Sequence, residues 1–84
     1  PITIAVDFDG TIVEQENKDV VVPSEIGKPK LNAIETLRRL RKEGFKIIIQ
    51  SGRLHWKGQR KIILKFLNDN QVPFDVLEAK NKEK

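Results

Sequence analysis

Residues 2–11 read Ile-Thr-Ile-Ala-Val-Asp-Phe-Asp-Gly-Thr, and this stretch decides which fold the rest of the chain can adopt. The pattern predicts a short buried strand over residues 2–6 that runs directly into two carboxylates, Asp7 and Asp9. Side chains alternate along a strand with a period of two, so we expect both carboxylates on the same side. Gly10 and Thr11 then break the strand and expose backbone N–H groups at its end.

Two carboxylates held close together repel each other, which favours either a shared proton or a bound cation. Mg²⁺ takes oxygen ligands, and it commonly binds one or two protein carboxylates together with phosphate and water. A lone Asp-x-Asp is more often a solvated turn. Here, however, the pair ends an apolar strand, where charged groups are costly unless a ligand or hydrogen bonds compensate them. The pair therefore predicts a site for a metal ion and a phosphate.

The segment Val-Asp-Phe-Asp-Gly-Thr, residues 6–11, resembles the first motif of the haloacid dehalogenase-like (HAD) phosphohydrolase superfamily. The resemblance implies a Rossmann-like α/β fold and Mg²⁺-dependent hydrolysis of a phosphomonoester through an aspartyl-phosphate. It also implies that Asp7 is the nucleophile and Asp9 the general acid/base. Mg²⁺ would be bound by the Asp7 carboxylate and the Asp9 backbone carbonyl, and Gly10 and Thr11 would help to hold the phosphoryl group.

The composition limits the chain to one small domain. It has 84 residues and no cysteine, so disulfides and thiolate zinc sites are excluded. No apolar run approaches membrane-spanning length and no signal-peptide pattern opens the chain, so we expect a cytoplasmic protein without a membrane partner. Sixteen basic residues against twelve acidic ones give a net charge of +4, but the charges are interspersed.

The rest of the chain alternates between patterns of strands and helices. They predict a hairpin flap over residues 12–23 with Asn17 near its tip, followed by a helix that Gly44 stops. An Asn32–Glu35 capping box would open that helix, with an earlier start at Pro29 as the alternative. Further along, the patterns predict a strand over 45–49, a helix over 59–68, and a strand over 74–79. Such an order predicts one α/β domain over residues 1–84, with a three-stranded parallel sheet in the order 1-2-3. The continuously apolar middle strand is expected to be covered on both faces.

The second candidate constellation is Gln-Ser-Gly-Arg, residues 50–53. A hydroxyl followed by glycine at a strand end offers the donors that a phosphoryl oxygen needs, which marks Ser51 and Gly52 as phosphate-binding residues. The pattern resembles the second HAD motif. Arg53 or Arg60 is a candidate contact for the leaving group, with solvent exposure as the alternative.

Two further residues follow Arg53 in a loop. The only histidine, His55, is more typical of a surface or hydrogen-bonded residue than of a catalyst. The only tryptophan, Trp56, favours packing over shielding of the site mouth.

Two further features of the family bear on the C-terminal part. The third HAD motif is a lysine after the third strand, and Lys80 fits best, with Lys82 and Lys84 as alternatives. The fourth motif, a strand ending in paired acids, is missing. Either the given chain ends before it, another chain pairs there, or the protein is a degenerate relative; we favour the first. The first strand then becomes a sheet edge through which a homo-oligomer could form.

Two alternatives to a phosphatase stay open. One is a non-catalytic HAD-like domain that binds a phosphate or a protein. The other is a basic nucleic-acid-binding module that uses Arg38, Arg39, Arg41 and Lys42. We rank it last, because basic residues in the last turn of a helix are already explained by the helix dipole. The class of phosphorylated substrate is left open.

Overall fold

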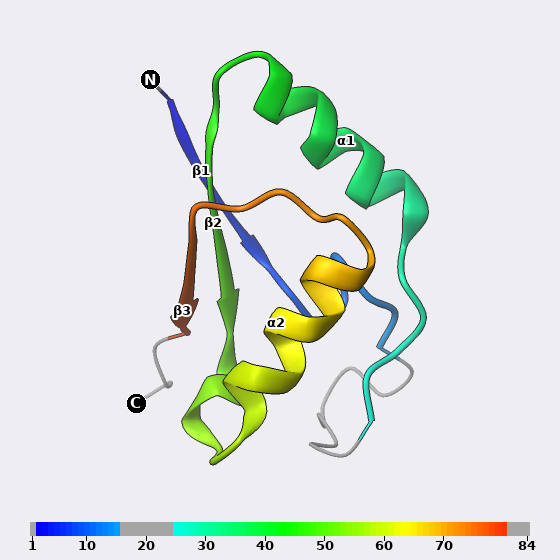
Figure 1. The fold of residues 1–84 in the computed structure, drawn as a ribbon, viewed down its shortest axis with the longest axis vertical. Helices are drawn as coiled ribbons and strands as arrows, with labels where there is room; N and C mark the ends of the chain where they lie inside the picture. The colour runs from blue at the N-terminus through cyan, green and yellow to red at the C-terminus, as the bar shows by residue number, and fades with distance from the viewer. Residues whose placement is uncertain (1, 16–24, 81–84) are drawn as a thin grey trace.

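The computed structural model describes residues 2–15 and 25–80 (Figure 1). In chain order the elements are strand β1 (Thr3–Asp7), helix α1 (Leu31–Lys42), strand β2 (Lys46–Ser51), the 3₁₀ turn η1 (Gly52–His55), helix α2 (Gln59–Asp69) and strand β3 (Val76–Ala79). Each strand matches a run rich in β-branched or aliphatic residues, and each helix carries apolar residues at helical spacing. Among the described residues, no helix has the length and apolarity needed to cross a membrane.

The three strands form one parallel sheet in the order β1-β2-β3, which confirms the predicted α/β topology. Val6 lies beside Ile49, and Ile49 lies beside Leu77, so one apolar row crosses the covered face of the sheet. Because all three strands are parallel, their carboxyl ends meet at one edge. Polar side chains that follow different strands are thereby brought to the same end of the molecule.

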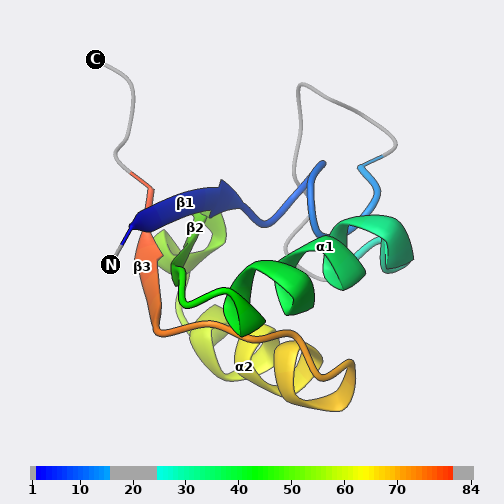
Figure 2. The same cartoon turned by 90° about the horizontal axis from the view of Figure 1, so that it is seen from above.

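Both helices pack on the same face of the sheet (Figure 2), so the expectation that β2 is covered on both faces was wrong. Ile47 and Ile49 are fully buried, whereas Ile48 between them is only half-buried. The reason is topological: two crossovers of the same hand that advance in the same direction place their helices on one side. For the same reason β1 is not fully buried, and Ala5 on the open face is exposed.

The chain leaves β1 through a tight turn anchored by Phe8, which lies between the two aspartates. Phe8 is fully buried and packs edge-to-face on Phe66, with ring centroids 5.5 Å apart. Its carbonyl accepts hydrogen bonds from the N–H groups of Ile12 and Val13. Gly10 has φ +86°, a conformation that most side chains disfavour, and so permits this turn. Phe8 therefore fixes the backbone that carries Asp7 and Asp9.

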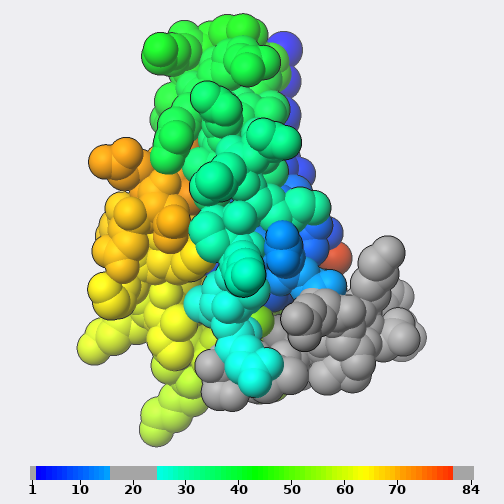
Figure 3. Space-filling view, turned by 90° about the vertical axis from the view of Figure 1, so that its right-hand side faces the viewer, coloured from blue at the N-terminus to red at the C-terminus, as the bar shows by residue number. Residues whose placement is uncertain are grey.

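The segment after this turn pairs with the segment that leads into α1, and Figure 3 shows the two side by side in blue and cyan. Glu14 N–H donates to the Lys28 carbonyl, and Lys30 N–H donates to the Ile12 carbonyl. Gly27 is required here, because a Cβ would lie 1.9 Å from the Glu14 carbonyl oxygen. The Asn17 tip and the whole second arm of the predicted hairpin lie outside the described residues.

Helix α1 begins earlier than the capping box predicted. Its N-cap is Lys30, whose side chain makes no capping hydrogen bond, and Asn32 lies inside the first turn. The early start follows from the pairing with residue 12: Lys30 is extended and donates its N–H to the Ile12 carbonyl, and its own carbonyl accepts from the Ile34 N–H as the helix begins. At the other end Gly44 follows the last turn, as predicted.

Two arginines of α1, Arg38 and Arg41, have intramolecular partners. Arg38 donates through Nε and Nη2 to the carbonyls of Gln71 and Asn70, beyond the end of α2. Arg41 pairs with Asp75 at 3.1 Å. Two of the four basic side chains considered for nucleic-acid binding therefore hold the helices and the β3 entry together.

Candidate active site at the carboxyl end of the sheet

The residues predicted from the motifs gather where the three parallel strands end. Asp7 is the last residue of β1, Ser51 is the last of β2, and Lys80 directly follows β3. Register places Asp7 beside Gln50 and Ser51 beside Ala79, so these positions lie at similar depth along the strands. The sheet itself thus supplies the alignment that chemistry between these side chains would need.

Asp7 meets the lysine that the sequence favoured. Lys80 Nζ lies 3.3 Å from Asp7 Oδ2, and both side chains are about half exposed. The strand end that carries Lys80 is tied down by two bonds: Lys80 N–H donates to the Ser51 carbonyl, and His55 Nε2 lies 2.7 Å from the Lys80 carbonyl. Because a carbonyl only accepts, Nε2 must be the donor. His55 therefore has a structural contact at the site.

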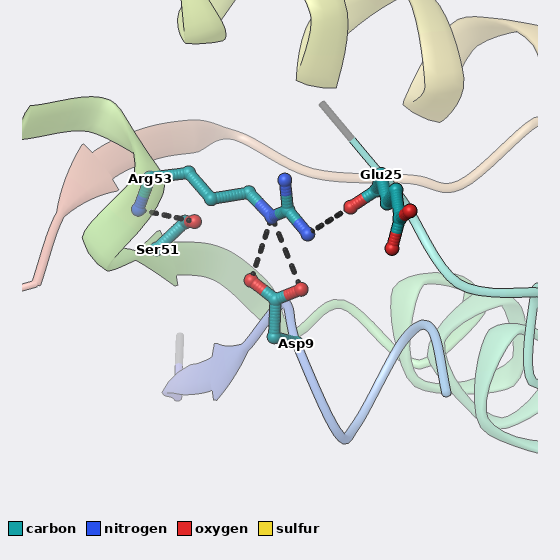
Figure 4. A network of polar contacts seen from close by, with 4 residues as sticks. All are labelled: Asp9, Glu25, Ser51 and Arg53. Atoms are coloured by element: carbon teal, nitrogen blue, oxygen red, sulfur yellow. Dashed lines mark hydrogen bonds and ion pairs between the residues drawn. The ribbon is translucent and has the colours of Figure 1, made fainter. Parts of the chain in front are cut away.

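Asp9 is held by Arg53, one of the two arginines that the sequence offered as a contact for the leaving group, with solvent exposure as the alternative. Arg53 Nε donates to both carboxylate oxygens of Asp9, at 3.1 and 2.9 Å, and Arg53 Nη2 donates to the Glu25 carbonyl (Figure 4). The side chain of Arg53 is only 3% exposed and that of Asp9 12%. Arg53 thus joins η1, the turn after β1 and the segment before α1.

Ser51 has two roles available in this arrangement. Its Oγ accepts a hydrogen bond from the Arg53 N–H at 3.1 Å, which caps η1. A hydroxyl that accepts in this way retains its own hydrogen for donation to a second oxygen. Ser51 is 3% exposed, and the following Gly52 is exposed. Among the described residues other than its two chain neighbours, no atom lies within 4 Å of where a Gly52 Cβ would be. Gly52 therefore leaves the approach to this turn open.

The turn after β1 uses backbone groups that the sequence had assigned to a phosphate. The Gly10 N–H donates to the Val13 carbonyl at 2.8 Å, and the Thr11 N–H donates more weakly to the Phe8 carbonyl at 3.4 Å. The Gly10 carbonyl accepts from Lys30 Nζ. Thr11 is exposed. In this conformation Thr11 is better placed than the Gly10 amide to offer a donor to a ligand.

The two aspartates lie in different surroundings. β1 ends at Asp7, so strand alternation does not extend to Asp9, which lies in the following turn. Within residues 2–15 and 25–80, no hydrogen bond joins Asp7 to Asp9 or to Ser51. Asp7 shares the open sheet face with Gln50 and Glu78, which are joined at 2.7 Å, while Ser51 lies on the helix-covered side. The structure thus gathers two groups: Asp7 with Lys80, and Asp9 with Arg53 and Ser51.

The residues fit Mg²⁺ as part of a coordination sphere. The Asp7 carboxylate is accessible, and the Asp9 carbonyl accepts no hydrogen bond within the part of the chain that the structure describes. Residues 2–15 and 25–80 include no cluster of three or more acidic, histidine or cysteine side chains that would enclose a metal ion. Mg²⁺ commonly keeps several waters and needs only one or two carboxylates, so two protein oxygens agree with its preferences.

Three of the contacts that sequence reasoning missed are long-range. Gln50–Glu78, His55–Lys80 and Asp9–Arg53 each join residues more than 20 positions apart. The sequence marked both Asp9 and Arg53 as candidate site residues, but it gave no sign that the two side chains would pair. Comparison of the chain with family models, curated proteins and solved structures finds no match in any of the three.

Proposed function

We propose that this chain is a Mg²⁺-dependent phosphomonoester hydrolase with a Rossmann-like, HAD-like fold. The observation that supports the proposal best is the meeting of Asp7 and Lys80, from opposite ends of the chain, at the carboxyl edge of a parallel sheet. Ligands of such sheets bind at that edge. A carboxylate beside an ammonium group suits attack on a phosphoryl group, because the cation offsets the negative charge brought together there.

In the proposed first step an Asp7 carboxylate oxygen attacks phosphorus. A bond forms between Asp7 and phosphorus, the bond from phosphorus to the ester oxygen breaks, and the leaving oxygen takes a proton from Asp9. Splitting one displacement into two in this way is nucleophilic catalysis. Proton transfer from a positioned carboxyl group contributes roughly 10²–10⁴-fold.

In the second step Asp9 takes a proton from water, whose oxygen attacks phosphorus. The bond between phosphorus and Asp7 breaks, inorganic phosphate leaves, and Asp7 is regenerated. Lys80 and the Ser51 hydroxyl would hold the phosphoryl oxygens during both steps, with the N–H of Gly52 and the Thr11 side chain as further donors. Bound Mg²⁺, held by the Asp7 carboxylate and the Asp9 carbonyl, would supply charge neutralisation on the phosphate.

The proposal is tested by Asp7→Asn. Turnover of para-nitrophenyl phosphate with Mg²⁺ is expected in the parent and is expected to fall to background in the variant, because an amide is a poor nucleophile. The matched control is Asp69→Asn, which changes an exposed carboxylate at the end of α2. Equal rates in the Asp7→Asn variant and the parent would rule out covalent catalysis by Asp7.

One observation favours a second candidate, a non-catalytic phosphate-binding domain. Asp9, the proposed general acid/base, is engaged by Arg53. In a binding domain that ion pair would be purely structural. Binding of inorganic phosphate without Mg²⁺-dependent turnover in the parent would select this candidate.

A further inference from the structure

We propose that Arg53 is a positioning residue for the phosphatase reaction, and that it acts by fixing the carboxylate of Asp9 instead of contacting the substrate. The inference rests on the proposed function, since Asp9 is the acid/base of that mechanism. It differs from both alternatives that the sequence left open for Arg53, a contact with the leaving group and exposure to solvent.

The burial of Arg53 argues against a role at the substrate. Its side chain is 3% exposed, and Figure 4 shows the guanidinium lying between Asp9 and Glu25. Nε is engaged by both Asp9 oxygens and Nη2 by the Glu25 carbonyl. An arginine that binds a phosphate usually presents two N–H groups in parallel to the ligand. Here the side chain presents its donors to the protein.

The geometry at Asp9 is what a positioning role requires. A carboxylate that accepts from one nitrogen through both oxygens loses rotation about its last torsion. Its 12% exposure leaves little room for other orientations. Asp9 also lies in a turn, not in a strand, so the sheet does not orient it directly. Proper placement of an acid/base matters strongly, because a misplacement of about 1 Å can cost roughly 10²-fold in rate.

The backbone of Arg53 is fixed as well. Its N–H donates to Ser51 Oγ, and its carbonyl accepts from the Trp56 N–H, which closes η1. The turn therefore begins on the residue proposed to bind the phosphoryl group. The turn η1 thus holds Ser51, the proposed phosphate donor, and through Arg53 it also fixes the orientation of Asp9. Rigid support of this kind is what a preorganised site needs.

The test compares Arg53→Lys with the matched control Arg38→Lys. Arg38 also donates through Nε and Nη2, to the carbonyls of Gln71 and Asn70, but it lies away from Asp9. Lysine keeps the positive charge and loses the two-oxygen hold. We expect Arg53→Lys to lower kcat about 10- to 100-fold. KM and the inhibition constant of inorganic phosphate should stay within about twofold, since no substrate contact is lost.

A second measurement separates positioning from loss of structure. In an Asp9→Asn background, Arg53→Lys should cause no further loss of kcat, because Asn cannot act as an acid/base wherever it lies. A merely structural arginine would lower activity in both backgrounds by the same factor. Thermal unfolding of each variant checks that the folded fraction is unchanged at the assay temperature.

Each outcome decides between the two proposals. A rise in KM and in the phosphate inhibition constant, with kcat kept, would make Arg53 a substrate contact and overturn the inference alone. An unchanged kcat in Arg53→Lys would also overturn it alone, as would equal losses in both backgrounds. A parent chain without Mg²⁺-dependent turnover would overturn the proposed function and the positioning role together.

Discussion

The ammonium group of Lys80 lies 3.3 Å from the carboxylate of Asp7, across 73 positions of the sequence. The contact forms because β1 and β3 run parallel on either side of β2, so that residues at their carboxyl ends face one another. In the proposed reaction, Lys80 is the described side chain best placed to offset charge as Asp7 approaches a phosphoryl group. A lysine-rich tail alone could not have distinguished it from Lys82 or Lys84, which lie outside the described residues.

We therefore expect Lys80→Met to lower kcat/KM for para-nitrophenyl phosphate by about 10²-fold, the usual cost of removing one charge-stabilising donor. The unfolding midpoint should barely change, because an exposed ion pair contributes little to stability. The control is Lys65→Met, which removes a lysine paired with Asp69 on the exposed side of α2. Equal losses in the two variants would remove Lys80 from the site.

Ser51→Ala is expected to have two separable effects. Loss of the cap on η1 should lower the free energy of unfolding by about 0.5–2 kcal/mol, since Oγ accepts from the Arg53 N–H. Loss of the hydroxyl donor should raise the inhibition constant of inorganic phosphate. Ser51→Thr, which keeps the hydroxyl, should restore both. If Ser51→Ala loses stability but binds phosphate as tightly as the parent does, Ser51 acts as a capping residue and not as a phosphate donor.

The contacts of Asp75 predict that part of the free energy of unfolding depends on pH. The N–H of Ile47 donates to its carboxylate at 2.8 Å and, with Arg41 beside it, holds the pKa of Asp75 below its ordinary value of 3.8. A carboxyl whose pKa is lower in the folded state stabilises the fold above its unfolded pKa. That stability is lost as the pH falls through the lower, folded value.

Asp75→Asn should accordingly be less stable than the parent at neutral pH, and the difference should shrink as the pH is lowered below about 3.8. Urea unfolding between neutral and acidic pH measures the difference at each point. Glu35→Gln, which changes an exposed carboxylate of α1, is the control and should show no such convergence. A gap between parent and Asp75→Asn that stays constant with pH would contradict this linkage.

The sequence predicted those parts of the fold that depend on local pattern. Three apolar runs separated by two amphipathic helices were enough to predict the parallel order β1-β2-β3. They were also enough to predict that Asp7, Ser51 and Lys80 lie at one edge of the sheet. The capping box failed because the hydrogen bond between Lys30 and Ile12 places the N-cap of α1 two residues before Asn32. Local pattern also gives no information on which face of the sheet a helix covers.

The partners of Asp9 could not be predicted for a different reason. The Asp9 carboxylate was expected on the same side as that of Asp7, because strand alternation was extended two residues past the end of β1. The fully buried Phe8 ends β1 and turns the chain, and Asp9 then meets Arg53, 44 positions away. Nothing in the spacing of residues 50–53 indicates whether an arginine there faces a ligand or a carboxylate of its own chain. Only the packing decides it.

The free edge of β1 leads to the last prediction. Ile2 C=O accepts from the Lys46 N–H, and Phe8 N–H donates to the Gln50 C=O. Because parallel strands alternate, the residues between, Thr3, Ala5 and Asp7, direct their backbone groups away from β2. No described residue pairs with them. An antiparallel register centred on Ala5 would pair Ala5 with its copy and Thr3 with Asp7, and so satisfy all three residues in a dimer.

We expect sedimentation of the 84-residue chain to show a monomer–dimer equilibrium that Ala5→Pro abolishes. Proline removes the outward N–H at this position but leaves the bonds to β2, and edge strands tolerate it there. The matched control is Ala79→Pro on the β3 edge, where the Ser51 carbonyl is bonded by Lys80 and the Ala79 N–H points away from β2. A parent chain that stays monomeric at the highest concentration measured would contradict pairing between copies. Dimers that survive Ala5→Pro but not Ala79→Pro would move the interface to β3.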